Sequence, residues 1–328
     1  MNYVVGIDGG ATKTAGLLAD LEGHVLAQGS AGPTNYQVVG SSGITNEVPQ
    51  LVHALFASAR VPEEKLACIA LGLAGVGRPG EPEQVAAIVE DLHLARKVVV
   101  DHDAIIALVG ALGDQPGLIV IAGTGSIALG RNAQGQRARC GGWGYLLGDE
   151  GSGYFVARQA LMAALKAFDG RAGETLLTKR LLGELGLQTV EEIIPRVYHQ
   201  GMSHDEMATL APLVFDAARK GDAVAQGILD RAGRELGLMA AAVISRLGMK
   251  GGNVTIGLVG SLFRDKDLLL APMQTVLSQV VQPEFIQPRL GPVQGATILA
   301  LKAAGVVVTS TMLRSLKGDS TELNRKRP

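Results

Sequence analysis

The sequence predicts an α/β protein with two similar domains that face each other across a cleft. Three observations carry this prediction: apolar strand-like runs alternate with helical periodicities, a strand–turn–strand pattern occurs twice, and glycine is abundant. The 328 residues include 44 glycines, about twice the average share in proteins. With 47% hydrophobic residues, a chain of this length can bury one large core or two of medium size.

The first hundred residues predict a three-stranded meander followed by alternating helices and strands. Glycine-containing turns at 8–14 and 20–23 separate the first three strands. Strands are expected at 3–7, 15–19, 24–28, 69–74 and 97–100. Helices are expected around 48–56, 85–92 and 104–112.

A second unit begins after a short boundary at 110–117, which has no low-complexity linker and therefore favours a hinge. Its start repeats the order of residues 3–23: a strand, a Gly/Thr turn, a second strand and a hairpin turn. The alternative is that any two β-hairpins share this likeness. Strands are expected at 118–122, 127–129 and 254–259, with mostly helical structure at 153–249 and a final helix at 294–304.

Charge and hydropathy exclude several classes of function. The net charge of −1 gives no basic balance for nucleic acid, and the basic cluster Asn324–Arg327 is expected to be a solvated tail. No apolar run reaches the ~18 residues of a membrane helix, and the first residues do not resemble a signal peptide. Cys68 and Cys140 match no zinc pattern. A cytoplasmic protein without nucleic-acid or membrane partners is therefore expected.

Three glycine-rich turns, at 9–14, 123–126 and 257–261, predict a nucleotide site. Glycine lets backbone N–H groups approach phosphate closely, while Thr hydroxyls and Lys13 add donors. The first two turns are expected to grip phosphates from opposite domains, and the third to lie against the nucleoside. Neither a Walker A nor a Rossmann motif is present, and a plain hairpin is the alternative for each turn. The candidate nucleotide-binding residues are Gly9, Gly10, Thr12, Lys13, Thr14, Gly123, Thr124, Gly125, Ser126, Gly260 and Ser261.

Asp8 ends an apolar strand beside the first of these turns. A carboxylate there would repel phosphate unless Mg²⁺ lies between them, directly or through water. Asp8 is therefore the candidate Mg²⁺ residue, with water as the expected bridge. The alternative is an Asx-turn residue that caps Gly10.

Seven short segments follow one another in a familiar order: GIDGGATKT (6–14), GPTNY (32–36), LGLAG (71–75), DHDA (101–104), AGTGS (122–126), CGGWG (140–144) and GDEGS (148–152). Together they resemble the sugar kinase, Hsp70 and actin ATPase superfamily. Within it, the chain is similar to the N-acetylglucosamine kinase group, also called the BadF/BadG/BcrA/BcrD ATPase family, and to archaeal ATP-dependent hexokinases.

The resemblance implies two ribonuclease H-like (actin-like ATPase) domains across a nucleotide-binding cleft. The N-terminal domain would be 1–112, with a helix at 296–316 packing back on it, and the C-terminal domain 113–295. The implied activity is transfer of the γ-phosphoryl group of MgATP to the 6-hydroxyl of an amino sugar or hexose, first of all N-acetylglucosamine. Glucosamine, glucose and muramic-type sugars stay open as acceptors. A homodimer is also expected.

A kinase that phosphorylates a hydroxyl needs a carboxylate to accept the proton and orient the oxygen. Asp103 is the candidate base, because it follows a strand, opens a helix and matches the family pattern in His102-Asp103-Ala104. Its alternative role is a helix N-cap. Asp101 is the rival base, and His102 is expected to be a structural hydrogen-bonding residue.

Sugar hydroxyls need directional donors and acceptors. Trp143 is the sole tryptophan, and its alternative role is core packing. Ala74 stands where some N-acetylglucosamine kinases carry a polar residue, whereas the segment 140–143 is closer to those enzymes. The resemblance assigns sugar binding to Asn35, Asp103, Thr124, Gly142, Trp143 and Asp149.

Two other functions fit the sequence less well. An activator ATPase of the same family would hold an iron–sulfur cluster, for which two distant cysteines are poorly suited. A sugar-sensing regulator is disfavoured because no DNA-binding segment or cysteine-rich zinc motif is recognised. A metal cluster of His199, His204, Asp205 and Glu206 is less expected than a solvated helix that begins at Ser203.

Overall fold

The computed structural model describes residues 2–317, which form two compact α/β units. Unit 1 contains the chain up to Gln115 and again from Pro288, and unit 2 contains Pro116–Gln287. The basic cluster 324–327 lies outside the described residues. Among those residues, every helix is too short or too polar to cross a membrane.

The sheet of unit 1 has the strand order β3-β2-β1-β4-β5. The first three strands pair antiparallel, and β4 and β5 continue the sheet parallel to β1. This is the predicted meander followed by alternating helix and strand. The strands are β1 (Tyr3–Gly9), β2 (Thr14–Asp20), β3 (Val25–Ala31), β4 (Cys68–Leu73) and β5 (Val98–His102).

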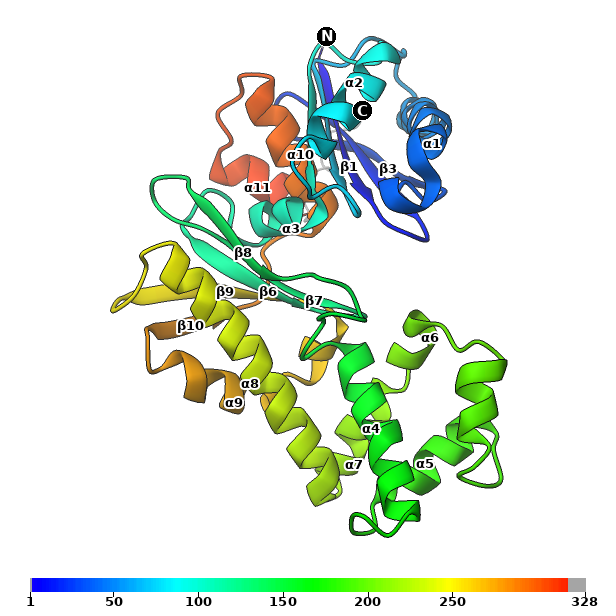
Figure 1. The fold of residues 1–328 in the computed structure, drawn as a ribbon. Helices are drawn as coiled ribbons and strands as arrows, with labels where there is room; N and C mark the ends of the chain where they lie inside the picture. Colours follow the sequence, from blue (N-terminus) through cyan, green and yellow to red (C-terminus); the bar gives the residue numbers. More distant parts are fainter. Residues whose placement is uncertain (1, 318–328) are drawn as a thin grey trace, which may run out of the picture. The chain divides into compact units, whose positions relative to one another are not determined.

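Helices cover both faces of this sheet (Figure 1). Side chains alternate along β1, so that Val5 and Ile7 pack with α1 and α2, whereas Val4 packs with α3, α10 and α11. The buried Cys68 belongs to the core that Val4 forms with α3, α10 and α11. The helices are α1 (Tyr36–Ala59), α2 (Glu81–Asp91), α3 (Asp103–Leu112), α10 (Pro292–Ala303) and α11 (Ser310–Leu316).

Residues 296–316 do not form the single helix that was expected. Gly305 adopts a φ of +88°, and its N–H donates to the Lys302 carbonyl while Val306 N–H donates to Leu301. This glycine-based C-cap ends α10, and α11 starts only at Ser310.

Unit 2 repeats the arrangement of unit 1, with the strand order β10-β9-β6-β7-β8. A meander of β6, β7 and β8 is extended by β9 and β10, which run parallel to β6. The internal repeat seen in the sequence is therefore confirmed at the level of topology. The strands are β6 (Gly117–Ala122), β7 (Ser126–Arg131), β8 (Arg137–Gly141), β9 (Asn253–Val259) and β10 (Gln282–Ile286).

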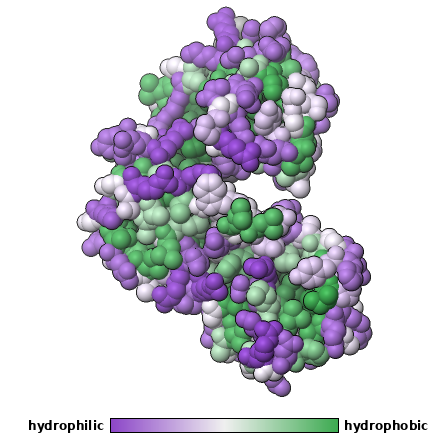
Figure 2. Space-filling view, viewed as in Figure 1, coloured by the Kyte–Doolittle hydropathy of each residue, from purple (hydrophilic) through white to green (hydrophobic). Residues whose placement is uncertain are grey.

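In the view of Figure 2, hydrophobic patches lie between hydrophilic ones on the surface of the described residues.

The mostly helical character predicted for 153–249 is confirmed. The helices are α4 (Gly153–Phe168), α5 (Leu176–Leu185), α6 (His204–Ala208), α7 (Ala211–Arg219), α8 (Ala223–Arg246) and α9 (Asp267–Leu277), with a π-helical turn at Pro195–His199 and a 3₁₀ helix at Ser261–Asp265.

In unit 1, α10 packs so closely on its neighbours that three glycines are required at the contacts. A side chain at Gly6 of β1 would collide with the backbone of α10 at Thr297. A side chain at Gly295 of α10 would collide with the backbone of α3 at Ile106, and one at Gly110 of α3 with Gly291. Backbone-to-backbone contact therefore fixes α10 against both β1 and α3.

We expect Gly295→Ala to lower the unfolding midpoint, because the added methyl group must push α10 away from α3. Overpacking of this kind costs about 1–3 kcal/mol and outweighs the gain of about 1 kcal/mol in helix propensity. Gly227→Ala is the matched control, since Gly227 lies in α8 with no atom within 4 Å of an added Cβ. Its midpoint should stay equal or rise, and equal shifts for both variants would contradict the packing argument.

Candidate active site

The parallel register of unit 1 gathers the predicted residues at one edge of the sheet. Gly9 of β1 lies beside Leu73 of β4, and Leu73 lies beside His102 of β5. The residues that follow these strand ends, Gly10 and Asp103 among them, therefore emerge together. In open α/β sheets this carboxyl-terminal edge is the usual place for ligands.

Backbone hydrogen bonds join the separate sequence motifs at this edge. Ala74 N–H donates to the Gly9 carbonyl at 2.8 Å. The N–H groups of Thr34 and Asn35 both donate to the Gly10 carbonyl, at 3.2 and 3.1 Å. The DGG turn thus holds the segments 32–36 and 71–75 beside it.

The turn after β1 places its predicted residues in two different environments. Thr12 and Lys13 are exposed, whereas Thr14 is fully buried. The Thr14 hydroxyl donates to the Gly32 carbonyl at 2.7 Å and lies 2.8 Å from the Thr34 hydroxyl. Thr14 is therefore engaged inside unit 1, while Thr12 and Lys13 are accessible to a ligand.

Asp8 and Asp103 lie close enough for their charges to interact. The pKa of Asp8 is raised to about 6, first by burial and then by the Asp103 carboxylate, while the Lys13 ammonium opposes both effects. The Gly10 N–H donates to the Lys13 carbonyl rather than to Asp8, so the Asx-turn interpretation of Asp8 is wrong. Two carboxylates with one nearby ammonium make this edge suited to a cation.

His102, and not Asp103, is the N-cap of α3. Its Nδ1 accepts the Ala104 N–H at 3.0 Å, in line with the structural role expected for this histidine. Asp103 is the first helical residue, and its Oδ1 lies 2.7 Å from both His102 Nδ1 and Ala104 N. The N-cap interpretation of Asp103 is wrong. Its side chain is 40% exposed, which leaves the carboxylate accessible to a substrate.

The rival base Asp101 lies inside β5. Its Oδ1 accepts the backbone N–H of His102 at 2.9 Å. Asp101 thus supports the end of the strand, next to the residue that caps α3.

In unit 2, the predicted turn 123–126 is tied to the start of α4. The N–H groups of Gly153 and Tyr154 donate to the carbonyls of Gly123 and Thr124, at 2.7 and 3.2 Å. The hydroxyl of the buried Ser126 donates to the Glu150 carbonyl at 2.7 Å. The Ser126 side chain therefore shapes the turn, whereas Thr124 lines a cavity that is described below.

Asp149 combines backbone strain with a buried carboxylate. It has a φ of +61°, which non-glycine residues rarely adopt, and its side chain is almost fully buried. Its Oδ1 accepts the Ser126 N–H at 3.1 Å, and a Cβ on Gly125 would lie 3.0 Å from both carboxylate oxygens. Burial raises the pKa of Asp149, and the Ser126 N–H opposes this effect. Such strain and desolvation are typical of functional positions.

The segment after β8 carries an exposed aromatic residue. Trp143 is 66% exposed, so the core-packing interpretation is wrong. The Arg139 guanidinium lies 4.6 Å from the Trp143 ring centroid. Gly142 has a φ of +70° and donates its N–H to the Ser126 carbonyl at 2.9 Å. This hydrogen bond places the start of the segment next to the turn 123–126.

A cavity of about 340 Å³ opens in unit 2 beside this turn. Its lining includes two predicted nucleotide-binding residues, Thr124 and Ser261, together with apolar and charged side chains. Gly260, which precedes the cavity residue Ser261, has a φ of +110° and packs on the backbone of Ala122. The cavity is lined by Thr124, Asp205, Ala208, Thr209, Ala211, Pro212, Phe215, Ser261, Leu262, Arg264 and Asp265.

Sequence reasoning missed the wall that α6 and α7 contribute to this cavity. The only signal there was the helix start at Ser203, which is confirmed because the Ser203 hydroxyl caps α6. Within residues 2–317, no three His, Cys, Asp or Glu side chains are placed to hold a metal ion, so His199, His204, Asp205 and Glu206 do not form a metal cluster. His204 instead stacks on Tyr145 with ring centroids 4.8 Å apart.

Several known proteins are similar to this chain. An N-acetylmuramic acid/N-acetylglucosamine kinase from Clostridium acetobutylicum is 36% identical, covering 82% of this chain and 88% of that protein. An N-acetyl-D-glucosamine kinase from Dictyostelium discoideum is 32% identical, over 91% of this chain and 98% of that one. The solved structure of a candidate N-acetylglucosamine kinase from Chromobacterium violaceum is 28% identical and has a TM-score of 0.75, covering 92% and 99% of the two chains.

The likeness extends over both units, so the fold is that of two actin-like ATPase domains, as predicted. A family model also matches residues 5–300, which include all seven of the sequence segments. The chain belongs to the BadF/BadG/BcrA/BcrD ATPase family.

Proposed function

We propose that this protein is an ATP-dependent sugar kinase that transfers the γ-phosphoryl group of MgATP to the 6-hydroxyl of N-acetylglucosamine. The observation that carries the proposal is the meeting of Asp8, Asp103 and the glycine turn 9–14 at one edge of unit 1. The N-acetylglucosamine kinases among the relatives support this acceptor.

Asp103 would act as the general base. Its carboxylate accepts the proton of the sugar hydroxyl while that oxygen forms a bond to the γ-phosphorus and the bond to the leaving ADP oxygen breaks. The exposure of Asp103 admits the substrate, and its contacts with His102 and the start of α3 hold the carboxylate in place.

Asp8 fits the expected Mg²⁺ site. Its partly buried carboxylate has a raised pKa because burial and Asp103 disfavour its charge, and a divalent cation would relieve both effects. Carboxylate oxygen, directly or through water, is the ligand that Mg²⁺ prefers. When bound, Mg²⁺ neutralises charge that develops on the phosphates.

Each unit offers a glycine turn that suits part of a nucleotide. Gly9, Gly10, Thr12 and Lys13 offer backbone N–H groups, a hydroxyl and an ammonium to phosphate. In unit 2 the turn 123–126 offers the same kind of backbone, and the 340 Å³ cavity next to Ser261 suits the nucleoside. Apolar Phe215 and Leu262 provide surfaces for a flat base.

Each unit offers hydrogen-bonding groups that suit a sugar. Asn35 offers an amide, and the buried Asp149 offers a carboxylate with a fixed orientation. Thr124, Gly142 and Trp143 lie on the segments next to Asp149 and complete the proposed acceptor site. A buried acceptor of this kind strongly disfavours analogues that lack the matching hydroxyl.

N-acetylmuramic acid is the second candidate acceptor, because one relative is a kinase for both sugars. The activator-ATPase alternative is weaker, since Cys68 is fully buried and burial raises its pKa to about 11. A thiol in this environment is poorly suited to ligate iron. The homodimer, the cytoplasmic location and the lack of a nucleic-acid partner stay predictions, and light scattering would test the first of them.

We expect ADP release to depend on N-acetylglucosamine and on Mg²⁺ in a coupled assay. The panel should include N-acetylmuramic acid, glucosamine and glucose, with Mg²⁺ omitted as the control. Turnover with none of these sugars would contradict the kinase proposal, and a stoichiometric iron content would favour the activator-ATPase alternative.

We expect Asp103→Asn to lower kcat by a factor of about 10² while sugar binding, followed by calorimetry, is retained. The amide keeps the size of the side chain but cannot accept the proton. Asp101→Asn is the matched control, because an amide oxygen can still accept the His102 N–H. A larger loss for Asp101→Asn than for Asp103→Asn would reverse the two assignments.

We expect Asp8→Asn to raise the unfolding midpoint at pH 7.5 in the presence of EDTA. Native Asp8 has a raised pKa of about 6 against 3.8 for the unfolded chain, so the native state binds more protons between these values. Wild-type stability therefore falls as pH rises through this window, by on the order of 1–3 kcal/mol. The advantage of Asp8→Asn should shrink toward pH 4.

Exposed Asp91→Asn, at the end of α2, controls for the loss of a surface carboxylate. A difference between Asp8→Asn and wild type that stays constant from pH 4 to 7.5 would contradict the assigned cause.

A further inference from the structure

The loop 74–80, which joins β4 to α2, lies between Asn35 and His102. A Cβ on Gly75 would come within 2.5 Å of the Asn35 Oδ1, and Gly75 has a φ of +79°. A Cβ on Gly77 would come within 2.8 Å of the His102 ring. The loop therefore contacts the proposed sugar amide on one side and the residue that precedes the proposed base on the other.

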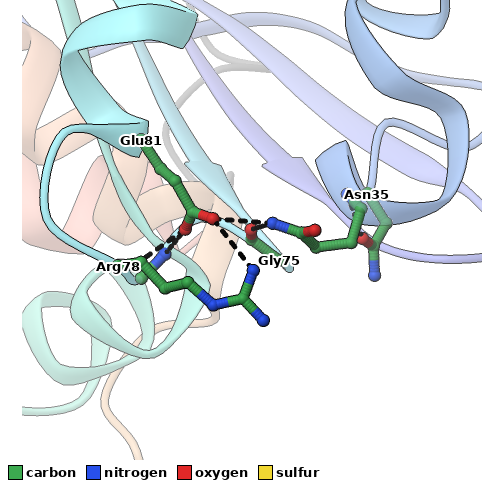
Figure 3. Close-up of polar contacts among 6 residues, drawn as sticks. Asn35, Gly75, Arg78 and Glu81 are labelled. Atoms are coloured by element: carbon green, nitrogen blue, oxygen red, sulfur yellow. Dashed lines mark hydrogen bonds and ion pairs between the residues drawn. The ribbon is translucent and has the colours of Figure 1, made fainter.

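One carboxylate holds this loop in place (Figure 3). The Oε2 of Glu81 accepts the N–H groups of Gly77 and Arg78, at 2.9 and 2.8 Å. Its Oε1 accepts the Gln37 side-chain amide at 2.7 Å and lies 3.4 Å from the Arg78 guanidinium. These bonds, above all the one from Gly77, lower the pKa of Glu81, so the carboxylate stays ionised near neutral pH.

Gln37 extends the connection from Glu81 to Asn35. Its side-chain amide also donates to the Gly75 carbonyl at 3.0 Å, and its backbone N–H donates to the Asn35 Oδ1 at 3.0 Å. This bond identifies Oδ1 as the oxygen of the amide. The Asn35 Nδ2 points away from the cluster in Figure 3 and is the group that can meet a sugar hydroxyl.

Contacts with the loop 74–80 help to hold the first turn of α1, because the helix is interrupted beyond that turn. Gly40 has a φ of +61° and a ψ of −159°, which are not helical values, and a Cβ there would meet no atom within 4 Å. The turn 36–39 is therefore not a rigid continuation of the buried part of α1. The turn is held to the loop 74–80 by the Tyr36 N–H, which donates to the Ala74 carbonyl at 3.2 Å, and by the bonds from the Gln37 side chain.

We propose that Glu81 is a positioning residue for the acceptor sugar. Through Gln37 it fixes the Asn35 amide, and through the N–H groups of Gly77 and Arg78 it fixes the loop that lies against His102. The separation between Asn35 and Asp103 is thus set before the sugar arrives, which reduces the ordering cost of binding. This inference rests on the proposed kinase function.

The test compares Glu81→Gln with Glu83→Gln. The amide keeps the size of the Glu81 side chain but has only one oxygen that can accept hydrogen bonds. In the wild type, one carboxylate oxygen accepts the backbone N–H groups and the other accepts the Gln37 amide. A loop and an Asn35 amide that are held less firmly should raise the KM for the sugar roughly tenfold, while the KM for ATP stays unchanged and kcat changes less. Glu83 is exposed in the same first turn of α2, so its variant controls for the helix terminus and should behave as wild type.

A second variant tests the connection itself. Gln37→Leu removes the amide that joins Glu81 to the first turn of α1, so it should raise the KM for the sugar as Glu81→Gln does. The double variant Glu81→Gln/Gln37→Leu should have a KM for the sugar no higher than that of the more affected single variant, because both substitutions interrupt the same connection. Multiplied effects would show that the two residues act independently and would overturn the proposal.

Hydrogen exchange gives a readout that needs no substrate. Peptides covering 34–40 and 74–80 should exchange faster in Glu81→Gln than in wild type, with no such change in Glu83→Gln. Unchanged exchange in Glu81→Gln would overturn the proposal that Glu81 holds these segments. A wild-type protein that phosphorylates no sugar would instead refute only the kinase function. An unchanged KM for the sugar in an active Glu81→Gln enzyme overturns the positioning role alone.

Discussion

The parallel pairing of β1, β4 and β5 is the constraint on which the rest of unit 1 depends. It sets Gly9, Leu73 and His102 side by side, so three loops must leave the sheet at one edge. The charge interaction between Asp8 and Asp103 follows from this register, since the two residues are far apart in sequence. A shift of one residue in either pair would turn the alternate side chains to the other face and separate these groups.

The two units place their proposed carboxylates in opposite environments. In unit 1, Asp103 is partly exposed at the first position of a helix, where a proton can be accepted and later passed to water. In unit 2, Asp149 is buried, held by the Ser126 N–H and fixed by an unfavourable backbone conformation. The first arrangement suits a group that changes its protonation state, and the second suits an acceptor whose position must not change.

Sequence patterns predicted most strands and the glycine turns, because buried strands and tight turns have local signatures. They missed β8 and β10, which are edge strands that carry arginines or a proline instead of an apolar run. They also missed Glu81 and the cavity wall from α6 and α7. Glu81 binds backbone N–H groups, which every residue except proline has, so no sequence motif marks its partners. Helical periodicity, for its part, does not reveal which helix borders a cavity.

The glycine contacts of α10 have a consequence for the order of folding. The strand β1 is made before unit 2, yet the helix that covers one of its faces follows unit 2 in the sequence. Unit 2 is continuous in sequence and can close as soon as it leaves the ribosome. Unit 1 must wait, with an apolar face of its sheet still uncovered, until α10 is synthesised. A nascent chain of this protein therefore needs protection from aggregation while unit 2 is being synthesised.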